Sequence, residues 1–294
     1  MKNNIHNKIK ECYSTWSKSY YNDYYKSTKN YPAIHIDIVK SLLKKNKIKN
    51  VLDIGCGPAS MLREISNRKL SCFGFDFTEE MIIEGKRILK KLNLDENNVW
   101  VGSATKKKDY YVKKKKYDSV ISFGVFPHLN NQEENKVIKN SYEILKKNGI
   151  ILIEARNSLF SLFTQNRYTS EFLRNNLIKI EPSIKEENDN LKKIFNRIED
   201  KLFMNQPFIR KGKKGMPGYD QVLSKTNNPF LMEEKFRRIG FKNIQTYFYH
   251  YHIVPPVYQK FLPKTFIKRS LKIENPLDWR GYFMASAFIT FGKK

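Results

Sequence analysis

Short apolar runs alternate with amphipathic segments between residues 50 and 155, and this alternation constrains the fold more than any other feature of the sequence. Strands that alternate with helices form β-α-β units, whose strands lie parallel in one sheet. The predicted strands are Asn50–Ile54, Ser71–Asp76, Val99–Gly102, Tyr117–Ser122 and Gly149–Ala155, and the predicted helices are Ser60–Asn67, Glu79–Leu92 and Asn131–Lys147. The sequence therefore predicts an α/β fold with a Rossmann-like sheet and helices on both of its faces.

The rhythm breaks after Ala155 and returns only near the end of the chain. A helix at Leu231–Ile239 and strands at Asn243–His252 and Tyr282–Phe291 are expected to complete the sheet. The stretch Lys211–Gly218 is predicted to be a loop because it is rich in glycine and lysine. We therefore divide the chain into a helical cap (1–45), a core (46–156), a substrate or lid insertion (157–228) and a C-terminal part of the sheet (229–294) with an insertion at 255–280.

Aromatic residues crowd the first 30 positions at spacings of three and four, which predicts one helix with an aromatic face. They are Tyr13, Trp16, Tyr20, Tyr21, Tyr24 and Tyr25. A second helix is predicted at Ala33–Lys45, with apolar residues along one side.

The formal net charge of +26 has two readings. A basic face gains affinity for nucleic acid or anionic membranes by releasing counterions. However, Lys, Asn and Ile are all abundant, and Lys far outnumbers Arg, which an AT-rich genome produces without any function. Arg is the residue suited to bidentate phosphate recognition, so we favour genome composition as the origin of the charge. Binding of an anionic small substrate is an interpretation intermediate between the two.

Two further observations bear on the compartment. No apolar stretch is long enough to span a bilayer, and the first ten residues lack the apolar segment of a signal peptide. Three cysteines, Cys12, Cys56 and Cys72, form neither a disulfide framework nor a metal-binding pattern. These features predict a reducing, cytoplasmic location.

The segment Val51–Gly57 is a strand that leads through a glycine-rich turn into a helix. Glycines allow a ligand to approach the backbone and allow positive φ angles. A dinucleotide prefers G-x-G-x-x-G/A, but Ser60 occupies the third glycine position. Asp53 would not favour an anionic pyrophosphate, whereas S-adenosylmethionine carries an ammonium and a sulfonium. The residues therefore favour S-adenosylmethionine.

The second strand ends at Asp76, 23 residues after Asp53. A carboxylate at this strand end can accept hydrogen bonds from both hydroxyls of a ribose, and Phe77 could cover one face of an adenine. Alternatively, Asp76 caps the following helix and Phe77 belongs to the core. The preceding glycine turn favours the ligand interpretation.

Four segments resemble, in order and spacing, the class I S-adenosylmethionine-dependent methyltransferases. They read V-L-D-I-G-C-G-P, G-F-D-F-T-E-E-M, Y-D-S-V-I-S and E-I-L-K-K-N-G-I-I-L-I-E-A. They look closest to the branch similar to ubiquinone and menaquinone biosynthesis enzymes, which acts mostly on small molecules. The resemblance covers residues 10–156 and, more loosely, 229–291, and it implies a mostly parallel sheet whose last strand is antiparallel.

The resemblance also implies a role for each matching position. Asp53, Gly55 and Gly57 would surround the methionine end of the cofactor, Asp76 would hold the ribose, and Phe77 would lie beside the adenine. Other implied cofactor contacts are Met81 of the second segment, and Phe123 and Gly124 near the transferred methyl. Tyr20 or Tyr21 would also contact the cofactor; alternatively, these tyrosines only form an aromatic helix face. The family usually has G-D-A after the third strand, where this chain has Ser103 and Ala104 after Gly102. Adenine recognition would then be weaker, or supplied from elsewhere.

Departures from related patterns exclude several chemistries. Enzymes that methylate exocyclic or amide nitrogens carry (D/N)-P-P-(Y/F/W) where this chain has Ser122–Val125. No cysteine is placed as the nucleophile of a cytosine-C5 enzyme. Carboxylates for a catechol-type metal site are missing just past the fourth strand, so we predict no metal.

Candidate catalytic and acceptor residues follow the later strands. Methyl transfer mainly requires donor and acceptor to be collinear, and a base is needed only for a hydroxyl or a protonated amine. His128 is the best-placed base, although it could simply start a helix. Arg156 could recognise an anionic acceptor or form a surface ion pair. Strand alternation would put His250 and His252 on one face, as an acceptor pocket, a metal site or a polar surface.

We therefore expect transfer of a methyl group to a small polar acceptor, most simply the hydroxyl of a sugar or nucleotide-linked sugar, with a nitrogen acceptor as second choice. An RNA- or protein-directed methyltransferase would use the basic surface, and a continuous basic face beside the pocket would favour it. A non-catalytic S-adenosylmethionine-binding protein is the third hypothesis, favoured only by Ser103.

Overall fold

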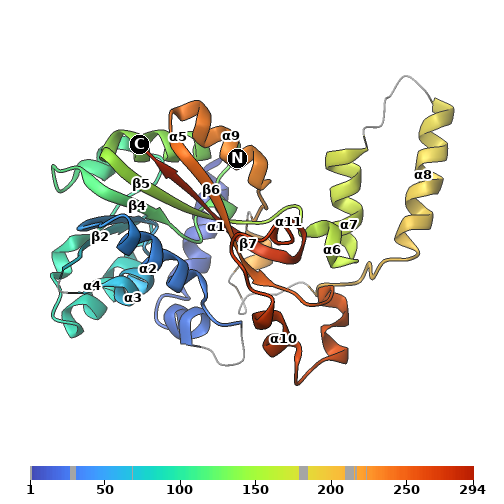
Figure 1. The fold of residues 1–294 in the computed structure, drawn as a ribbon, viewed down its shortest axis with the longest axis horizontal. Helices are drawn as coiled ribbons and strands as arrows, with labels where there is room; N and C mark the ends of the chain where they lie inside the picture. Colours follow the sequence, from blue (N-terminus) through green and yellow to red (C-terminus); the bar gives the residue numbers. More distant parts are fainter. Residues whose placement is uncertain are drawn as a thin grey trace. The chain divides into compact units, whose positions relative to one another are not determined.

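The computed structural model describes residues 2–26, 31–67, 69–178, 185–208, 215, 217–222 and 224–294 (Figure 1). The chain forms two compact units. The first comprises residues 1–156, 210–247 and 287–294, and the second comprises 157–209 and 248–286. The predicted loop at Lys211–Gly218 lies mostly outside the described residues.

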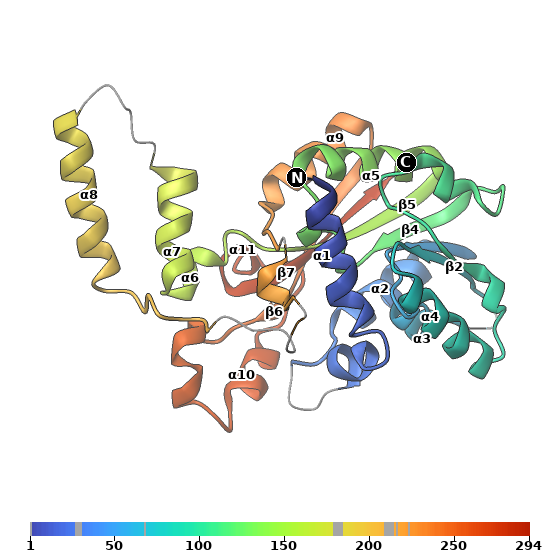
Figure 2. The same cartoon turned by 180° about the vertical axis from the view of Figure 1, so that it is seen from behind.

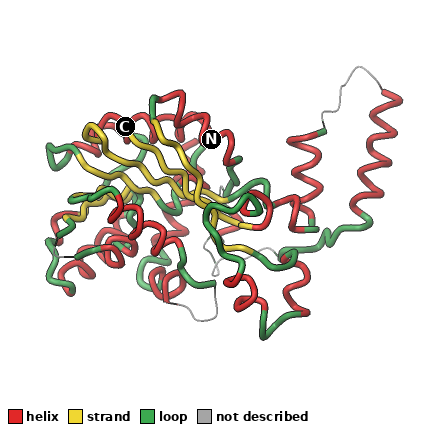
Figure 3. The backbone as a smooth tube through the Cα atoms, in the orientation of Figure 1, coloured by secondary structure: helices red, strands yellow, loops and turns green. Residues whose placement is uncertain are grey.

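The first unit is built on a seven-stranded sheet with the order β3-β2-β1-β4-β5-β7-β6 (Figure 3). Strands β1 to β5 pair in parallel, and β7 runs antiparallel to β5, so the predicted Rossmann-like sheet with its antiparallel last strand is confirmed. The strands are β1 (Asn50–Ile54), β2 (Ser71–Asp76), β3 (Val99–Val101), β4 (Tyr117–Ser122), β5 (Leu145–Arg156), β6 (Lys242–Tyr251) and β7 (Ala285–Lys293).

Helices cover both faces of the sheet, which is why its central strands are continuous apolar runs. In Figures 1 and 2, α2, α3 and α4 lie on one face, and α5 and α9 lie on the other. Their bounds are α2 (His35–Lys45), α3 (Ser60–Ile65), α4 (Glu79–Lys91), α5 (Asn131–Ile144) and α9 (Pro229–Ile239). Val51, Leu52 and Ile54 of β1 are fully buried between these layers.

The predicted boundary between α5 and β5 was wrong. The helix begins with a capping box between Asn130 and Glu133, as its sequence suggests. It ends at Ile144 rather than at Lys147, and β5 starts at Leu145, which pairs with Tyr117 of β4. The register shifts before Ser119 pairs with Ile150. Strand pairing thus overrides the helical periodicity of residues 145–147.

The prediction of one aromatic helix at the N-terminus was also wrong. Helix α1 (Lys2–Ser14) ends before Trp16, and a turn leads to a π-helical segment, η1 (Asn22–Lys26). At the break, Thr15 Oγ1 donates to the carbonyl of Cys12 and Ser17 Oγ to that of Ser14. Such side-chain bonds to the backbone compete with helix continuation. The aromatic residues after the break therefore do not belong to α1.

The second unit contains α6 (Ser161–Thr164), α7 (Arg167–Phe172), η5 (Leu173–Leu177), α8 (Lys185–Glu199), η7 (Pro256–Phe261), α10 (Phe266–Lys272) and α11 (Gly281–Met284). The last predicted strand begins three residues late, at Ala285, because Gly281–Met284 is helical. The Asn157 side chain stabilises this turn by donating to the carbonyls of Gly281, Tyr282 and Ala285. No helix among the described residues is long and apolar enough to cross a membrane.

Candidate functional site

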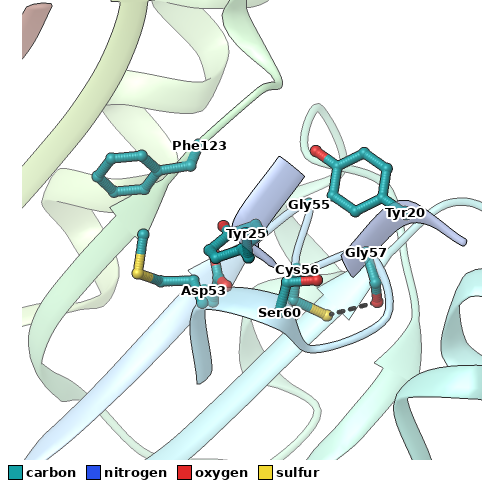
Figure 4. A pocket seen from close by; sticks show the side chains of 9 residues that line it. Tyr20, Tyr25, Asp53, Gly55, Cys56, Gly57, Ser60 and Phe123 are labelled. Atoms are coloured by element: carbon teal, nitrogen blue, oxygen red, sulfur yellow. Dashed lines mark hydrogen bonds between the residues drawn. The ribbon is translucent and has the colours of Figure 1, made fainter. Parts of the chain in front are cut away.

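A pocket lies at the carboxyl end of β1 (Figure 4). Carboxyl ends of strands in open α/β sheets are where such folds bind ligands. In the view of Figure 4, the rings of Phe123 and Tyr20 flank the side chains of Asp53 and Tyr25. The lining residues are Tyr20, Tyr25, Asp53, Gly55, Cys56, Gly57, Ser60, Met61 and Phe123. The structure therefore brings together Asp53, Gly55, Gly57, Phe123 and Tyr20 of the predicted site.

The turn after β1 needs glycine at two positions. Gly55 and Gly57 have φ angles of +71° and +51°, in the region that side chains rarely adopt. A Cβ on Gly55 would also lie only 2.2 Å from Cγ2 of Val125. A Cβ on Gly57 would meet nothing closer than Sδ of Met81, at 3.9 Å. Met81 thus packs behind Gly57, and Val125 lies where a side chain on Gly55 would point.

The backbone amides of this turn already have acceptors inside the protein. The N–H groups of Gly55 and Cys56 donate to the carbonyl of Phe75, at 2.8 and 3.0 Å. The amide of Gly57 donates to Oδ2 of Asp76 at 3.0 Å, and that of Ala59 to the carbonyl of Cys56. A pyrophosphate bound at a glycine-rich turn needs free amide donors. The turn is therefore poorly suited to an anionic ligand.

Asp53 places a buried carboxylate in the pocket. The residue is 2 % exposed, and among the described residues its Oδ1 has no hydrogen-bond partner. Burial raises the pKa of the Asp53 carboxyl well above its usual range, and the nearby Asp76 raises it further. A buried carboxylate without a partner is costly. A ligand with a positively charged donor would provide the missing partner for Asp53. The buried Oγ of Ser60 also has no hydrogen-bond partner among the described residues, and a hydroxyl of the ligand would provide one.

Asp76 holds the turn together. Its Oδ2 accepts from Gly57, and its Oδ1 accepts from the amide of Thr78 at 2.8 Å. Burial raises the pKa of the Asp76 carboxyl, while these backbone amides lower it in part. Each oxygen retains a second lone pair, so ribose binding by Asp76 stays a prediction beside this structural role.

Phe77 packs away from the pocket lining, against a small cluster formed by Ile9, Cys12 and Val222. This contact agrees with the alternative interpretation, in which Phe77 belongs to the core. Its placement beside an adenine stays a prediction.

The segment after β3 carries a carboxylate that the sequence motifs did not reveal. The amide of Ser103 donates to Oδ2 of Asp109 at 2.8 Å, and Ser103 Oγ lies 3.1 Å from Oγ1 of Thr105. The Ala104 carbonyl accepts from the Tyr110 hydroxyl at 2.7 Å. Asp109 thus brings a carboxylate to the backbone of Ser103, the position at which the resemblance would place an aspartate. It was missed because it lies six positions further along.

The segment after β4 is organised by a second residue that sequence reasoning missed. Gly124 has a φ of +72°, and its amide donates to Oε2 of Glu154 on β5 at 2.8 Å. A Cβ on Gly124 would lie 3.6 Å from the hydroxyl of Tyr20. Glu154 is the only acidic residue in the apolar run Ile150–Ala155, and this isolated acid was the sequence feature that could have indicated its role.

Aromatic rings form one wall of the pocket. Tyr25 contacts His35 at a centroid distance of 5.5 Å, and His35 stacks on Phe123 at 5.7 Å. Burial raises the pKa of both Tyr20 and Tyr25, so both phenols are neutral at physiological pH. Tyr21 points elsewhere: its hydroxyl donates to Glu64, and burial followed by this bond raises its pKa to about 12. Tyr25, not Tyr21, joins Tyr20 in the lining.

Cys56 lines the pocket without the properties of a nucleophile. Its Sγ donates to the carbonyl of Gly57 at 3.6 Å, the dashed line of Figure 4. Burial raises the pKa of the thiol well above its usual range, so the thiolate is disfavoured. Within the described part of the chain, no three His, Cys, Asp or Glu side chains group closely enough to hold a metal ion.

His128 follows β4, and Arg156 is the last residue of β5, in the same unit. His128 is 7 % exposed, and its Nε2 lies 2.8 Å from the hydroxyl of Tyr13. The Tyr13 ring contacts that of Tyr20 at 6.2 Å, which places the His128–Tyr13 pair next to the pocket wall. Arg156 donates from Nη1 to Ser224 Oγ at 2.9 Å.

His250 and His252 belong to the second unit. His250 has a φ of +60°, and β6 ends at Tyr251, so the regular strand alternation assumed for the two residues is interrupted. His252 packs against Phe160 at 4.9 Å and Phe266 at 5.4 Å. Burial, and then the nearby His250, lowers the pKa of His252 to about 4, which keeps its imidazole neutral.

A family model described as a methyltransferase domain matches residues 45–217. No curated protein sequence matches the chain. Solved structures that resemble the fold include a candidate O-methyltransferase from Nostoc punctiforme PCC 73102, with 12% identity and a TM-score of 0.50 over 96% of this chain and 60% of that one.

Two other structures are similar at lower scores. A SAM-dependent methyltransferase from Archaeoglobus fulgidus has 17% identity and a TM-score of 0.45 over 88% of this chain and 94% of its own. Magnesium protoporphyrin IX methyltransferase from Synechocystis PCC 6803 has 13% identity and a TM-score of 0.46 over 88% and 81%. At these identities the likeness bears on the fold alone.

Proposed function

This chain belongs to the family of methyltransferase domains, and from that premise we propose that it transfers a methyl group from S-adenosylmethionine to the hydroxyl of a small polar acceptor. One observation carries the choice of cofactor. Asp53 offers a buried carboxylate whose Oδ1 has no hydrogen-bond partner among the described residues, while the neighbouring turn amides are already engaged. This arrangement suits a ligand with an ammonium group and disfavours a pyrophosphate, hence it favours S-adenosylmethionine over a dinucleotide.

The other lining residues fit the same ligand. S-adenosylmethionine supplies a methyl group on a positively charged sulfur. The faces of Tyr20, Tyr25 and Phe123 stabilise a nearby cation, and they exclude water from the pocket. In-line displacement breaks the sulfur–methyl bond and forms the bond to the acceptor, so the main task of these side chains is to hold both partners collinear.

The acceptor side supports a small molecule. None of the nine lining residues is Lys or Arg. The basic run Lys113–Lys116 precedes β4, so it lies at the amino end of that strand and not at the pocket. A continuous basic face beside the pocket would favour RNA, and neither the nine lining residues nor Lys113–Lys116 contributes to one. We therefore propose the small-molecule branch similar to ubiquinone and menaquinone biosynthesis enzymes.

We further propose Arg156 as the contact for an anionic group on the acceptor, and residues 157–228 as the acceptor-binding insertion. His250 and His252 are proposed acceptor contacts, since a neutral, half-buried His252 suits a polar, uncharged group.

Calorimetric titration of the purified protein with S-adenosylmethionine and, separately, with NAD tests the cofactor. We expect saturable binding of S-adenosylmethionine and no heat from NAD. A folded protein that binds NAD, or neither ligand, would overturn the proposal. Transfer of labelled methyl to sugar, nucleotide-sugar and phenol panels then tests the acceptor class.

A hydroxyl acceptor must lose a proton, and we propose that it passes to Nε2 of His128, directly or through the Tyr13 hydroxyl. His128→Gln should lower kcat roughly 100-fold, since a general base typically contributes that much, while the Kd for S-adenosylmethionine stays unchanged. Tyr13→Phe separates the two routes, because only a relay through the phenol loses kcat in this variant.

His6→Gln is the matched control, since His6 is an exposed residue paired with Glu133. Wild-type turnover in His128→Gln, with a hydroxyl acceptor, would remove His128 from the chemistry.

A further inference from the structure

One segment of the second unit is strongly basic and contains no acid. Residues 256–272, which form η7 and α10, carry Lys260, Lys264, Lys268, Arg269 and Lys272, all of them exposed. The lysine-rich composition of the chain alone does not explain the absence of acids from this segment, because α8 in the same unit contains both acidic and basic residues along its length. The local charge of +5 is therefore a property of this segment.

The acids that follow this segment are engaged elsewhere. Oε1 of Glu274 accepts from the amide of Tyr251 at 2.7 Å. The Asp278 carboxylate pairs with Arg280 at 2.7 Å. The five cations of residues 256–272 are exposed, so the basic character of the segment persists on its surface.

The segment is fixed to its unit by a few buried side chains. Val257 is 4 % exposed and Phe266 is 3 % exposed, and Phe266 packs edge-on against His252. Ser270 is fully buried and accepts from the amide of Ile253 at 3.1 Å. These residues face inward, whereas the five cations of the segment are exposed.

Large apolar side chains stand out from the same unit. Among the described residues, the three most exposed aromatic side chains are Phe208, Trp279 and Phe261, at 78 %, 71 % and 68 %. Phe261 lies between Lys260 and Lys264 in sequence, and Lys260 Nζ is 5.3 Å from its ring centre. Leu277, two residues before Trp279, is 60 % exposed. Leaving such groups in water has a free-energy cost that a partner would remove.

From this combination we propose that the 256–272 segment is a docking surface for an anionic lipid bilayer, with Phe261 inserted at the interface and the cations on lipid head groups. Interfacial segments combine lysines on a polar face with Phe, Trp or Leu on the other, and lysines near an anionic membrane are attracted to it. Leu277, five residues beyond the segment, is also exposed, and its side chain is suited to a bilayer rather than to RNA, because an aliphatic side chain enters acyl chains but does not stack on bases.

Co-sedimentation of the full chain with vesicles tests the surface. We expect binding to vesicles of 70 % phosphatidylcholine and 30 % phosphatidylglycerol, weakening with salt, and little binding to pure phosphatidylcholine. The triple variant Lys260→Gln, Phe261→Ser, Lys264→Gln should bind at least about 100-fold more weakly, because the phenylalanine contributes roughly tenfold or more and each lysine roughly fivefold. The control Ile83→Ser, Lys86→Gln, Lys90→Gln removes one exposed apolar group and two exposed charges from α4 and should bind as the wild type does.

Insertion depth gives a second readout. The three native cysteines are buried, so an environment-sensitive dye can be attached to Phe261→Cys, with Ile83→Cys as control. Emission should shift to the blue on anionic vesicles only for the label at 261.

The proposal is overturned if the wild type does not bind anionic vesicles, or if both triple variants bind equally. It is also overturned if the Phe261 variant loses affinity for single-stranded RNA while vesicle binding stays at background. None of these readouts depends on methyl transfer, so they stand apart from the test of the enzyme's function.

Discussion

Asp53→Asn is expected to weaken S-adenosylmethionine binding by about 1,000-fold while leaving the protein folded. The wild-type carboxylate is buried and unpartnered at Oδ1 among the described residues, so it can form a charge-assisted bond to the cofactor's ammonium. Losing one side of a buried charged pair costs about 2–5 kcal/mol, and an amide of the same size keeps the shape of the pocket. Calorimetry measures the loss, and Asp95→Asn, at an exposed aspartate remote from the pocket, is the control.

The same substitution should stabilise the unliganded protein, and the gain should depend on pH. Because the pKa of Asp53 is raised in the folded state, the folded protein binds more protons than the unfolded chain between the ordinary and the raised pKa. The free energy of unfolding therefore falls as pH rises through that window, by at most about 1.4 kcal/mol per pH unit for one carboxyl. Below the ordinary pKa of an aspartate, both states are protonated and the effect disappears.

Urea denaturation at pH 4 and pH 8 measures this dependence. Asp53→Asn should be more stable than the wild type at pH 8, by a margin that shrinks toward pH 4. Cofactor binding should also release a proton from the wild type, visible as a binding enthalpy that differs between phosphate and Tris buffers. Equal affinity in wild type and variant, or a variant less stable at pH 8, would contradict the assignment of Asp53.

The sheet could be predicted from the sequence where burial alone decides structure. Strands β1, β2 and β4 have the predicted bounds, because a strand buried on both faces must be a continuous apolar run. The predictions failed where local bonds or strand pairing compete with apolar periodicity. Thr15 and Ser17 end α1 through bonds to the backbone, and the pairing of Leu145 with Tyr117 shortens α5.

The site could be predicted where one segment holds several of its residues. Asp53, Gly55 and Gly57 lie within five positions, so a single strand and turn bring them together. Tyr25 could not be distinguished from its neighbours, because its orientation depends on the π-helical turn after α1. Asp109 and Glu154 were missed because each contacts the site through a backbone amide, of Ser103 and of Gly124. Any residue offers such an amide, so no sequence pattern marks the contact.

Gly55→Ala is expected to destabilise the fold by about 3 kcal/mol. Two effects add: a φ of +71° strains any residue with a side chain, by of order 1–3 kcal/mol, and the new methyl group would meet Val125 at 2.2 Å. Overpacking of this kind costs a further 1–3 kcal/mol or so. Urea denaturation of the unliganded protein measures the total.

Two further variants separate the contributions. Gly57→Ala has a similar φ of +51° but no close neighbour, so it reports the backbone strain, about 1 kcal/mol. Val125→Ala in the Gly55→Ala background should recover the steric part, so the double-mutant cycle gives a favourable coupling between positions 55 and 125. Additive effects, or a Gly55→Ala variant as stable as the wild type, would mean that the turn relaxes around a side chain. In that case Gly55 would serve ligand approach alone, and its variant should lose cofactor affinity without losing stability.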